Sequence, residues 1–158
     1  MNKVRTLPQI KILSEMLRIH KYKLVTINGS FDLLHAGHIK SLKLAKEQGD
    51  ILIVGLNSDK SIKIYKSKDR PIIAQEQRAE MLDAIRYVDY IVIMDEPEIA
   101  VPLIKIVKPH IHVNSAEYSK DCVESKILKE IGAKLVLIPK YKKISTTNVI
   151  KKIHKLKH

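Results

Sequence analysis

The chain has 158 residues, of which 45% are hydrophobic, and it carries a formal net charge of +12. This hydrophobic share suits a globular core and excludes a disordered chain, while the lone cysteine, Cys122, excludes an internal disulfide framework. No apolar run approaches the roughly 20 residues of a membrane span, and the N-terminal residues lack the apolar region of a signal peptide. We therefore expect one domain over residues 1–158 that is cytoplasmic and has no membrane partner.

The surplus of positive charge predicts an anionic ligand. The chain has 29 lysines and arginines against 17 acidic residues, an excess that attracts nucleic acid, acidic lipids or phosphorylated small molecules. Aromatic residues make up only 4% of the chain, which offers few surfaces on which the bases of single-stranded nucleic acid could stack. Nucleic acid is therefore not the expected partner, and a general bias toward lysine and isoleucine would explain the surplus equally well.

The predicted elements begin with a helix from about Pro8 to Arg18, within an N-terminal lead-in of residues 1–20. Five short runs rich in β-branched residues follow, and each is continuously apolar, as strands buried on both faces are. These runs are residues 23–27, 51–56, 90–94, 110–113 and 134–138. Segments with helical spacing separate them, and a last helix is expected from about Thr146 to Lys155.

This alternation of strands and helices predicts an α/β fold with a parallel sheet and right-handed crossovers. In such sheets ligands bind beyond the carboxyl ends of the strands, where the strand order reverses. The loops after Ile27, Leu56, Met94, Val113 and Ile138 are therefore expected to form the functional edge.

The segment after the first strand, "NGSFDLLHAGH", carries the most distinctive polar pattern. Asn28 and Gly29 predict an unusual backbone turn. His35 and His38 stand three residues apart where a helix begins, so the two imidazoles should share a face. Together with the free N–H groups of a helix start, they favour binding of an anion whose charge grows during a reaction. The alternative is that both histidines are structural or solvated.

Two further segments add groups that bind anions. Ser145, Thr146 and Thr147 stand where the last helix begins, as N-cap residues do. The segment of residues 57–71 is expected to be a mobile loop, and Arg78 and Arg86 are expected to share one face of the next helix. The cations expected to converge on this edge are Lys60, Lys63, Lys66, Lys68, Arg70, Arg78, Arg86, Lys140, Lys142 and Lys143.

His110 and His112 alternate along a strand, and Cys122 follows them. These three side chains could hold zinc, but no further ligand stands at a regular spacing. Packing of the histidines near a strand end is therefore the favoured interpretation.

Several motifs, in order and spacing, resemble one enzyme family. "NGSFDLLHAGH" resembles the signature of the HxGH nucleotidyltransferases, the cytidylyltransferase-like group. "KVRTL", "GLNSD", "RPI", "EQRAEMLDAIRYVDYIV" and "STTNVIKKI" resemble the adenylyltransferase domain of the ADP-heptose synthases. The resemblance implies a Rossmann-like, doubly wound parallel sheet of five strands and a homodimer. It also implies transfer of AMP from ATP to a sugar 1-phosphate, such as heptose 1-phosphate, with release of pyrophosphate.

The resemblance also assigns roles to single residues. His35, His38 and Lys66 are the expected catalytic residues, and Mg²⁺ is expected to arrive with ATP and to have no ligand on the protein. The residues expected to bind the nucleotide are Asn28, Gly29, Ser30, Phe31, Asp32, Arg86, Ser145, Thr146 and Thr147. Those expected to bind the acceptor and its phosphate are Arg78, Asn114, Glu117, Tyr118 and Lys140. Relatives carry "KGGDY" where this chain has "NSAEY", which leaves the base and the acceptor open.

Two other functions stay open. One is a cytidylyltransferase that acts on glycerol 3-phosphate or a related polyol phosphate. The other is a non-catalytic descendant of the fold that binds a nucleotide or a nucleic acid. The net charge favours this second alternative, whereas the presence of His35, His38, Lys66 and Arg86 together argues against it.

Overall fold

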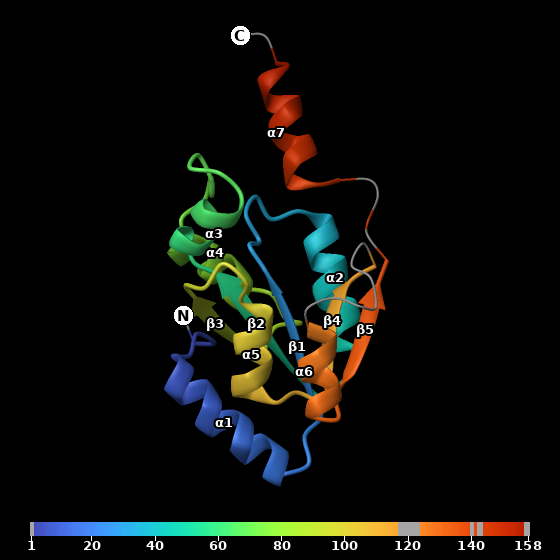
Figure 1. Ribbon diagram of the computed structural model, residues 1–158. Helices are drawn as coiled ribbons and strands as arrows, with labels where there is room; N and C mark the ends of the chain where they lie inside the picture. Colours follow the sequence, from blue (N-terminus) through green and yellow to red (C-terminus); the bar gives the residue numbers. More distant parts are fainter. Residues whose placement is uncertain (1, 117–123, 140, 142–143, 157–158) are drawn as a thin grey trace.

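A computed structural model shows a five-stranded parallel sheet with helices on both faces (Figure 1). The structure describes residues 2–116, 124–139, 141 and 144–156. The strands are β1 (Leu24–Gly29), β2 (Ile51–Asn57), β3 (Tyr90–Met94), β4 (Ile111–Ser115) and β5 (Lys134–Ile138). The helices are α1 (Leu7–Ile19), α2 (Ala36–Lys46), α3 (Asp59–Tyr65), α4 (Gln75–Asp83), α5 (Ala100–Val107), α6 (Glu124–Glu130) and α7 (Thr146–His154).

The strands lie in the order β3-β2-β1-β4-β5, and all neighbouring pairs are parallel. From β1 the chain runs outward to β2 and β3, and then returns to place β4 on the other side of β1. The loops after β1 and β4 therefore diverge and leave a crevice at the carboxyl edge of the sheet. This arrangement confirms the predicted doubly wound, Rossmann-like fold.

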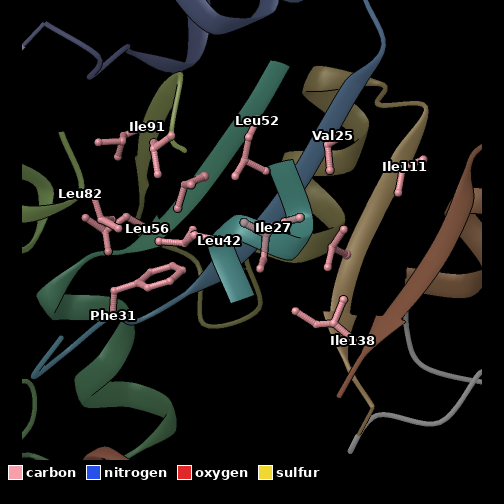
Figure 2. Close-up of a cluster of buried hydrophobic side chains, with 14 of the residues drawn as sticks. Val25, Ile27, Phe31, Leu42, Leu52, Leu56, Leu82, Ile91, Ile111 and Ile138 are labelled. Atoms are coloured by element: carbon pink, nitrogen blue, oxygen red, sulfur yellow. The ribbon is translucent and has the colours of Figure 1, made fainter. Parts of the chain in front are cut away.

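The strands are continuously apolar because both faces of the sheet are covered. On one face Val25, Leu52 and Leu56 pack against Leu42 of α2 and Leu82 of α4, as Figure 2 shows for this cluster. The other face bears a second cluster, which extends onto α1 and α5: Leu24, Ile53, Val92, Ile10, Leu103 and Val107. Full burial of such a side chain stabilises the fold by about 1.5–3 kcal/mol.

The prediction of a mobile loop over residues 57–71 is wrong for the first half of this segment, because Asp59–Tyr65 forms α3. Ser58 caps this helix, since its hydroxyl accepts a hydrogen bond from the N–H of Ser61 at 3.1 Å. Ile62 is fully buried and anchors the helix to the body. The segment has too few buried apolar positions for helical spacing to stand out in its sequence.

The last helix, α7, confirms the helix predicted at about Thr146 to Lys155. It points away from the sheet, with its N-terminal end nearest the loop between β1 and α2 (Figure 1). At that end the hydroxyl of Thr146 donates a hydrogen bond to the backbone oxygen of Asp32 at 3.0 Å. Within the described part of the chain, no helix combines the length and apolar character that crossing a membrane requires.

Candidate active site

A cleft of about 520 Å³ opens at the carboxyl edge of the sheet, as predicted, and residues at or just beyond the ends of all five strands line it. The predicted site residues that line the cleft are Asn28, Gly29, Ser30, Phe31, His35, His38, Lys66, Asn114, Ser145, Thr146 and Thr147. Asp32, Arg78 and Arg86 are not among its lining residues. Glu117, Tyr118 and Lys140 lie outside the residues that the structure describes.

His35 and His38 form a stacked pair at the start of α2. Their ring centroids lie 3.8 Å apart with an angle of 16° between the planes. His35 is the N-cap residue, and its Nδ1 accepts a hydrogen bond from the N–H of Gly37 at 3.1 Å. Nδ1 of His38 accepts from the N–H of His35 at 3.4 Å. Because both Nδ1 atoms are acceptors, each neutral ring carries its proton on Nε2 and can donate it to a ligand.

Burial keeps this pair neutral. Burial lowers the pKa of His35, and burial together with the electrostatic effects of the adjoining His35 and of the Lys66 cation lowers the pKa of His38 to about 4. At neutral pH the two rings are therefore neutral donors. They can donate hydrogen bonds from Nε2 to developing negative charge without acting as imidazolium acids.

We expect the imidazole of His38 to titrate with a midpoint near pH 4 in an NMR titration of the histidine nitrogens. An unfolded histidine has a pKa of about 6.5, so between pH 6.5 and 4 the unfolded state binds more protons than the native state. The free energy of unfolding should therefore decrease as the pH falls through this range. A midpoint near 6.5 for His38 would contradict the neutral-donor geometry.

Gly37, between the two histidines in sequence, leaves room for the ring of His35 in its observed position. A Cβ at this position would lie 2.9 Å from Cε1 and 3.0 Å from Nδ1 of His35. We expect Gly37→Ala to displace the ring of His35 and to lower kcat at least about tenfold, since small misplacements in a site carry large costs. Alanine favours a helix by up to about 1 kcal/mol over glycine. This gain should offset the cost of displacing the ring, so the thermal unfolding temperature should change little. A wild-type kcat for Gly37→Ala would show that catalysis does not depend on the position of His35.

The prediction of an unusual turn at Asn28 and Gly29 is wrong in its position. Gly29 ends β1 without a positive φ, and the left-handed residues are Phe31 (φ 45°) and Leu33 (φ 41°). Gly29 instead provides space, since a Cβ there would lie 3.1 Å from the ring of Phe31. A left-handed backbone at two non-glycine residues is strained and persists only where the surroundings hold it in place.

Asp32 holds this strained loop. Its carboxylate forms an ion pair with Arg70 and accepts hydrogen bonds from the N–H groups of Ile72 and Ile73. Burial alone would raise the pKa of Asp32, but these backbone bonds and the charge of Arg70 bring it below its usual value. The aspartate therefore ties the histidine loop to the segment before α4, and its carboxylate is occupied by protein groups.

Arg78 is fully buried, and the structure does not support its predicted role in binding phosphate. Its Nε donates to the backbone oxygen of Ile73 at 2.9 Å, and Nη1 donates to the backbone oxygens of Ser30 and Asn57. Nη2 forms an ion pair with Asp59 at 2.7 Å. The guanidinium therefore joins the segments that follow β1 and β2 and is not presented to the cleft.

Arg86 lies at the opposite edge of the sheet. Helix α4 ends at Asp83, so Arg86 and Arg78 do not share a helical face as predicted. Arg86 precedes β3, and the nearby N–H of Asp89 bonds to the oxygen of Leu52 near the start of β2. The exposed guanidinium of Arg86 lies over the ring of Tyr87. The predicted convergence of many cations is therefore wrong in part.

Among the described residues, Lys66 is the predicted cation that lines the cleft, while Lys140, Lys142 and Lys143 lie outside them. It follows α3, and its Nζ donates to the hydroxyl of Ser30 at 2.8 Å. Partial burial and the positive charge of Arg70 lower its pKa. At the same edge, Ser145 caps α7 as predicted, with its hydroxyl accepting from the N–H of Asn148 at 3.2 Å. The N–H groups of the next two residues point out of the helix start.

Several lining residues were not predicted from the sequence. Asn57 ends β2 and Glu98 follows β3, so the rule that ligands bind at the carboxyl ends of the strands could have found them. Tyr141 and Glu124 also line the cleft, but neither stands in a recognisable motif. Glu124 begins α6, and only the folded chain brings it beside Asn114 of β4.

The described residues contain no group of three or more histidine, cysteine or acidic side chains that could hold a metal ion. His112 is fully buried, and its Nδ1 lies 2.8 Å from the hydroxyl of Thr26 on β1. Nδ1 of His110 accepts from the N–H of Leu24 at 3.0 Å. Both histidines therefore hydrogen-bond to β1, His112 in the core and His110 at an exposed position near the start of β4, while Cys122, the third residue of the possible zinc site, lies outside the described residues.

Two solved structures illustrate the similarity of the fold to known proteins. A lipopolysaccharide core biosynthesis protein from Thermoplasma volcanium has a TM-score of 0.62 and 28% identity, over 77% of this chain and 99% of that chain. Pantoate-beta-alanine ligase from Francisella tularensis has a TM-score of 0.69 over 98% of this chain and 78% of that chain. Its identity is only 18%, so this second likeness concerns the fold alone.

The sequence comparisons find relatives of higher identity. The bifunctional protein HldE of Campylobacter fetus is 46% identical over 144 residues, which are 89% of this chain and 30% of that protein. HldE of Campylobacter concisus is 45% identical over 96% of this chain and 32% of that protein. The chain thus spans about a third of the length of these curated relatives. Residues 26–152, which include the histidine pair and the start of α7, match the cytidylyltransferase-like family, and the chain therefore belongs to this family of nucleotidyltransferases.

Proposed function

We propose that this chain transfers AMP from ATP to a sugar 1-phosphate that resembles heptose 1-phosphate, and releases pyrophosphate. The stacked pair of neutral histidines carries the proposal, because it brings two Nε2–H donors together in a cleft that Lys66 also lines. The HldE relatives support the choice of substrates, as do the motifs that resemble the adenylyltransferase domain of the ADP-heptose synthases.

The proposed reaction is a direct displacement at phosphorus. An oxygen of the acceptor phosphate forms a bond to the α-phosphorus of ATP, and the bond from that phosphorus to the β-phosphate oxygen breaks. Pyrophosphate leaves with the electron pair. A sugar phosphate is already ionised at neutral pH, so the attack needs no general base, and catalysis rests on positioning and on stabilisation of charge.

The residues of the cleft suit these two tasks. The Nε2–H groups of His35 and His38 would donate to oxygens of the α-phosphate as their charge grows. Lys66 would supply positive charge to the departing pyrophosphate, and the start of α7, at Thr146 and Thr147, would bind the triphosphate through backbone N–H groups. The strained loop held by Asp32 fixes the approach to α2.

We propose that Mg²⁺ enters with ATP as part of the substrate. The carboxylate nearest the histidines in sequence, Asp32, is occupied by Arg70 and two backbone N–H groups. Magnesium that comes with a triphosphate takes most of its ligands from phosphate and water oxygens. From the resemblance we further propose that the protein is cytoplasmic and forms a homodimer. Light scattering of the purified protein would test the dimer.

The test is pyrophosphate release in the presence of Mg²⁺. ATP, CTP, GTP and UTP would each be paired with heptose 1-phosphate, glycerol 3-phosphate and other sugar phosphates. We expect release with ATP and heptose 1-phosphate. Release with CTP and a polyol phosphate would refute the proposed substrates but support nucleotidyl transfer. No release from folded protein that binds a nucleotide would favour a non-catalytic binding role.

A further inference from the structure

One wall of the cleft carries an acidic group that the proposed chemistry does not use. Glu124, the first residue of α6, lines the cleft and is only 8% exposed. Its Oε1 accepts a hydrogen bond from Nδ2 of Asn114 at 3.3 Å. None of the ion pairs within the described residues includes Glu124. A buried carboxylate that accepts one amide N–H has the capacity to accept several more hydrogen bonds.

The imidazole of His112, on which the charge of Glu124 acts, does not neutralise this carboxylate. His112 stands two residues before Asn114 on β4, so their side chains share a face of the sheet. Burial lowers the pKa of His112 to about 4 against the opposing effect of the negative charge of Glu124, so the ring is neutral at pH 7. Its Nε2 is buried and has no hydrogen-bond partner among the described residues. Among the described residues, this wall therefore combines a buried carboxylate that is in no ion pair with a buried imidazole nitrogen that has no hydrogen-bond partner.

The charge of Glu124 limits what it can bind. A phosphate would be repelled, and the donors proposed for the phosphates lie at the start of α2, on the other face of the sheet from α6 (Figure 1). A metal ion would need further anionic ligands, and the described residues hold no group of three that could supply them. Two adjacent hydroxyl groups fit best, because each can donate one hydrogen bond to a carboxylate without adding charge.

We propose that Glu124, positioned by Asn114, binds a pair of adjacent hydroxyl groups on a substrate of the nucleotidyl transfer and selects for ligands that carry them. This inference rests on the proposed function. The diol could belong to the ribose of the nucleotide or to the acceptor sugar. In both cases one end of the cleft binds phosphates and the other binds a neutral, hydroxylated part, which sets the direction in which the ligand lies.

The test compares Glu124→Gln with Glu130→Gln, a matched change at an exposed position of the same helix. Pyrophosphate release would be measured with ATP and 2′-deoxy-ATP, and with the acceptor and analogues that each lack one hydroxyl. We expect Glu124→Gln to raise KM for the diol-bearing substrate at least about tenfold while kcat changes little, and to reduce the preference over the deoxy analogue. Loss of preference in the ATP pair identifies the ribose, and loss in the acceptor pair identifies the sugar.

Two results would overturn the inference. One is Glu124→Gln keeping the preferences of Glu130→Gln in both pairs. The other is that Glu124→Gln lowers kcat/KM by the same factor for every substrate and also lowers the unfolding temperature, which would indicate a structural role. In that case Glu124→Asp, which keeps the negative charge, should also show no preference for the substrate with the diol over its deoxy analogue. If the wild type releases no pyrophosphate, the proposed function fails separately. Calorimetry would then measure the binding of ATP, 2′-deoxy-ATP and the sugar phosphates to Glu124→Gln and Glu130→Gln, which compares their preference for the diol without turnover.

Discussion

Replacing His38 with alanine is expected to lower kcat for pyrophosphate release at least about a hundredfold, the cost of removing one donor to charge that develops in a transition state. The ring of His38 stacks at 3.8 Å on that of His35 and shares its cleft. Alanine would remove one Nε2–H donor and also the stacking partner that holds His35. Because the lost interaction forms in the transition state, kcat and kcat/KM should fall by similar factors.

Two comparison variants make this result specific. His38→Gln keeps a neutral N–H donor and should lose less activity than the alanine variant. His20→Ala removes an exposed histidine at the end of α1 and should keep the wild-type rate. Thermal unfolding of each variant would separate lost chemistry from lost folding. A folded His38→Ala protein with wild-type kcat would refute the role of the histidine pair.

Arg78→Leu is expected to lower the free energy of unfolding by about 3–5 kcal/mol, the usual cost of breaking a buried ion pair by removing one partner. Arg78 is fully buried, and its guanidinium bonds to three backbone oxygens and to Asp59. Leucine would leave these acceptors without their donors. Since native domains are stable by only about 5–15 kcal/mol, a large part of the variant could be unfolded at 37 °C.

Denaturant unfolding would measure this change, with Arg86→Leu as the matched control. Arg86 is exposed at the other edge of the sheet, so its replacement should alter stability by no more than about 0.5 kcal/mol. If Arg78→Leu unfolded like the wild type and showed only a raised KM for phosphate-bearing substrates, Arg78 would bind phosphate, as the sequence resemblance implied.

The fold could be predicted because its strongest signals are local. Each strand is a continuous apolar run, since helices cover both faces of the sheet, and α1 begins with a capping box between Thr6 and Gln9. Helix α3 could not be predicted in the same way. It has Ser58 as its cap but only Ile62 as a buried large apolar side chain, and its exposed positions mix Lys60 and Lys63 with Ile64 and Tyr65, so no apolar face stands out.

The candidate site could be predicted only where the residues that form it are close in sequence. His35, His38 and Gly37 share one helix start, so their spacing already fixed their geometry. Arg78 and Arg86 seemed equivalent as cations, yet the end of α4 at Asp83 leaves one in the core and the other at the opposite edge. The pairing of Asn114 with Glu124 depends on β4 and α6 meeting in space, which no local pattern encodes.

The most direct test of the central proposal is the fate of the α-phosphate of ATP. The protein would be incubated with Mg²⁺, heptose 1-phosphate and ATP labelled at either the α- or the γ-phosphorus. Nucleotidyl transfer in the histidine cleft predicts that the α label appears in a nucleotide sugar and the γ label in pyrophosphate, and that both signals are lost in His38→Ala. Transfer of the γ label to the sugar or to free orthophosphate would contradict the account, because attack would then occur at the other end of the triphosphate.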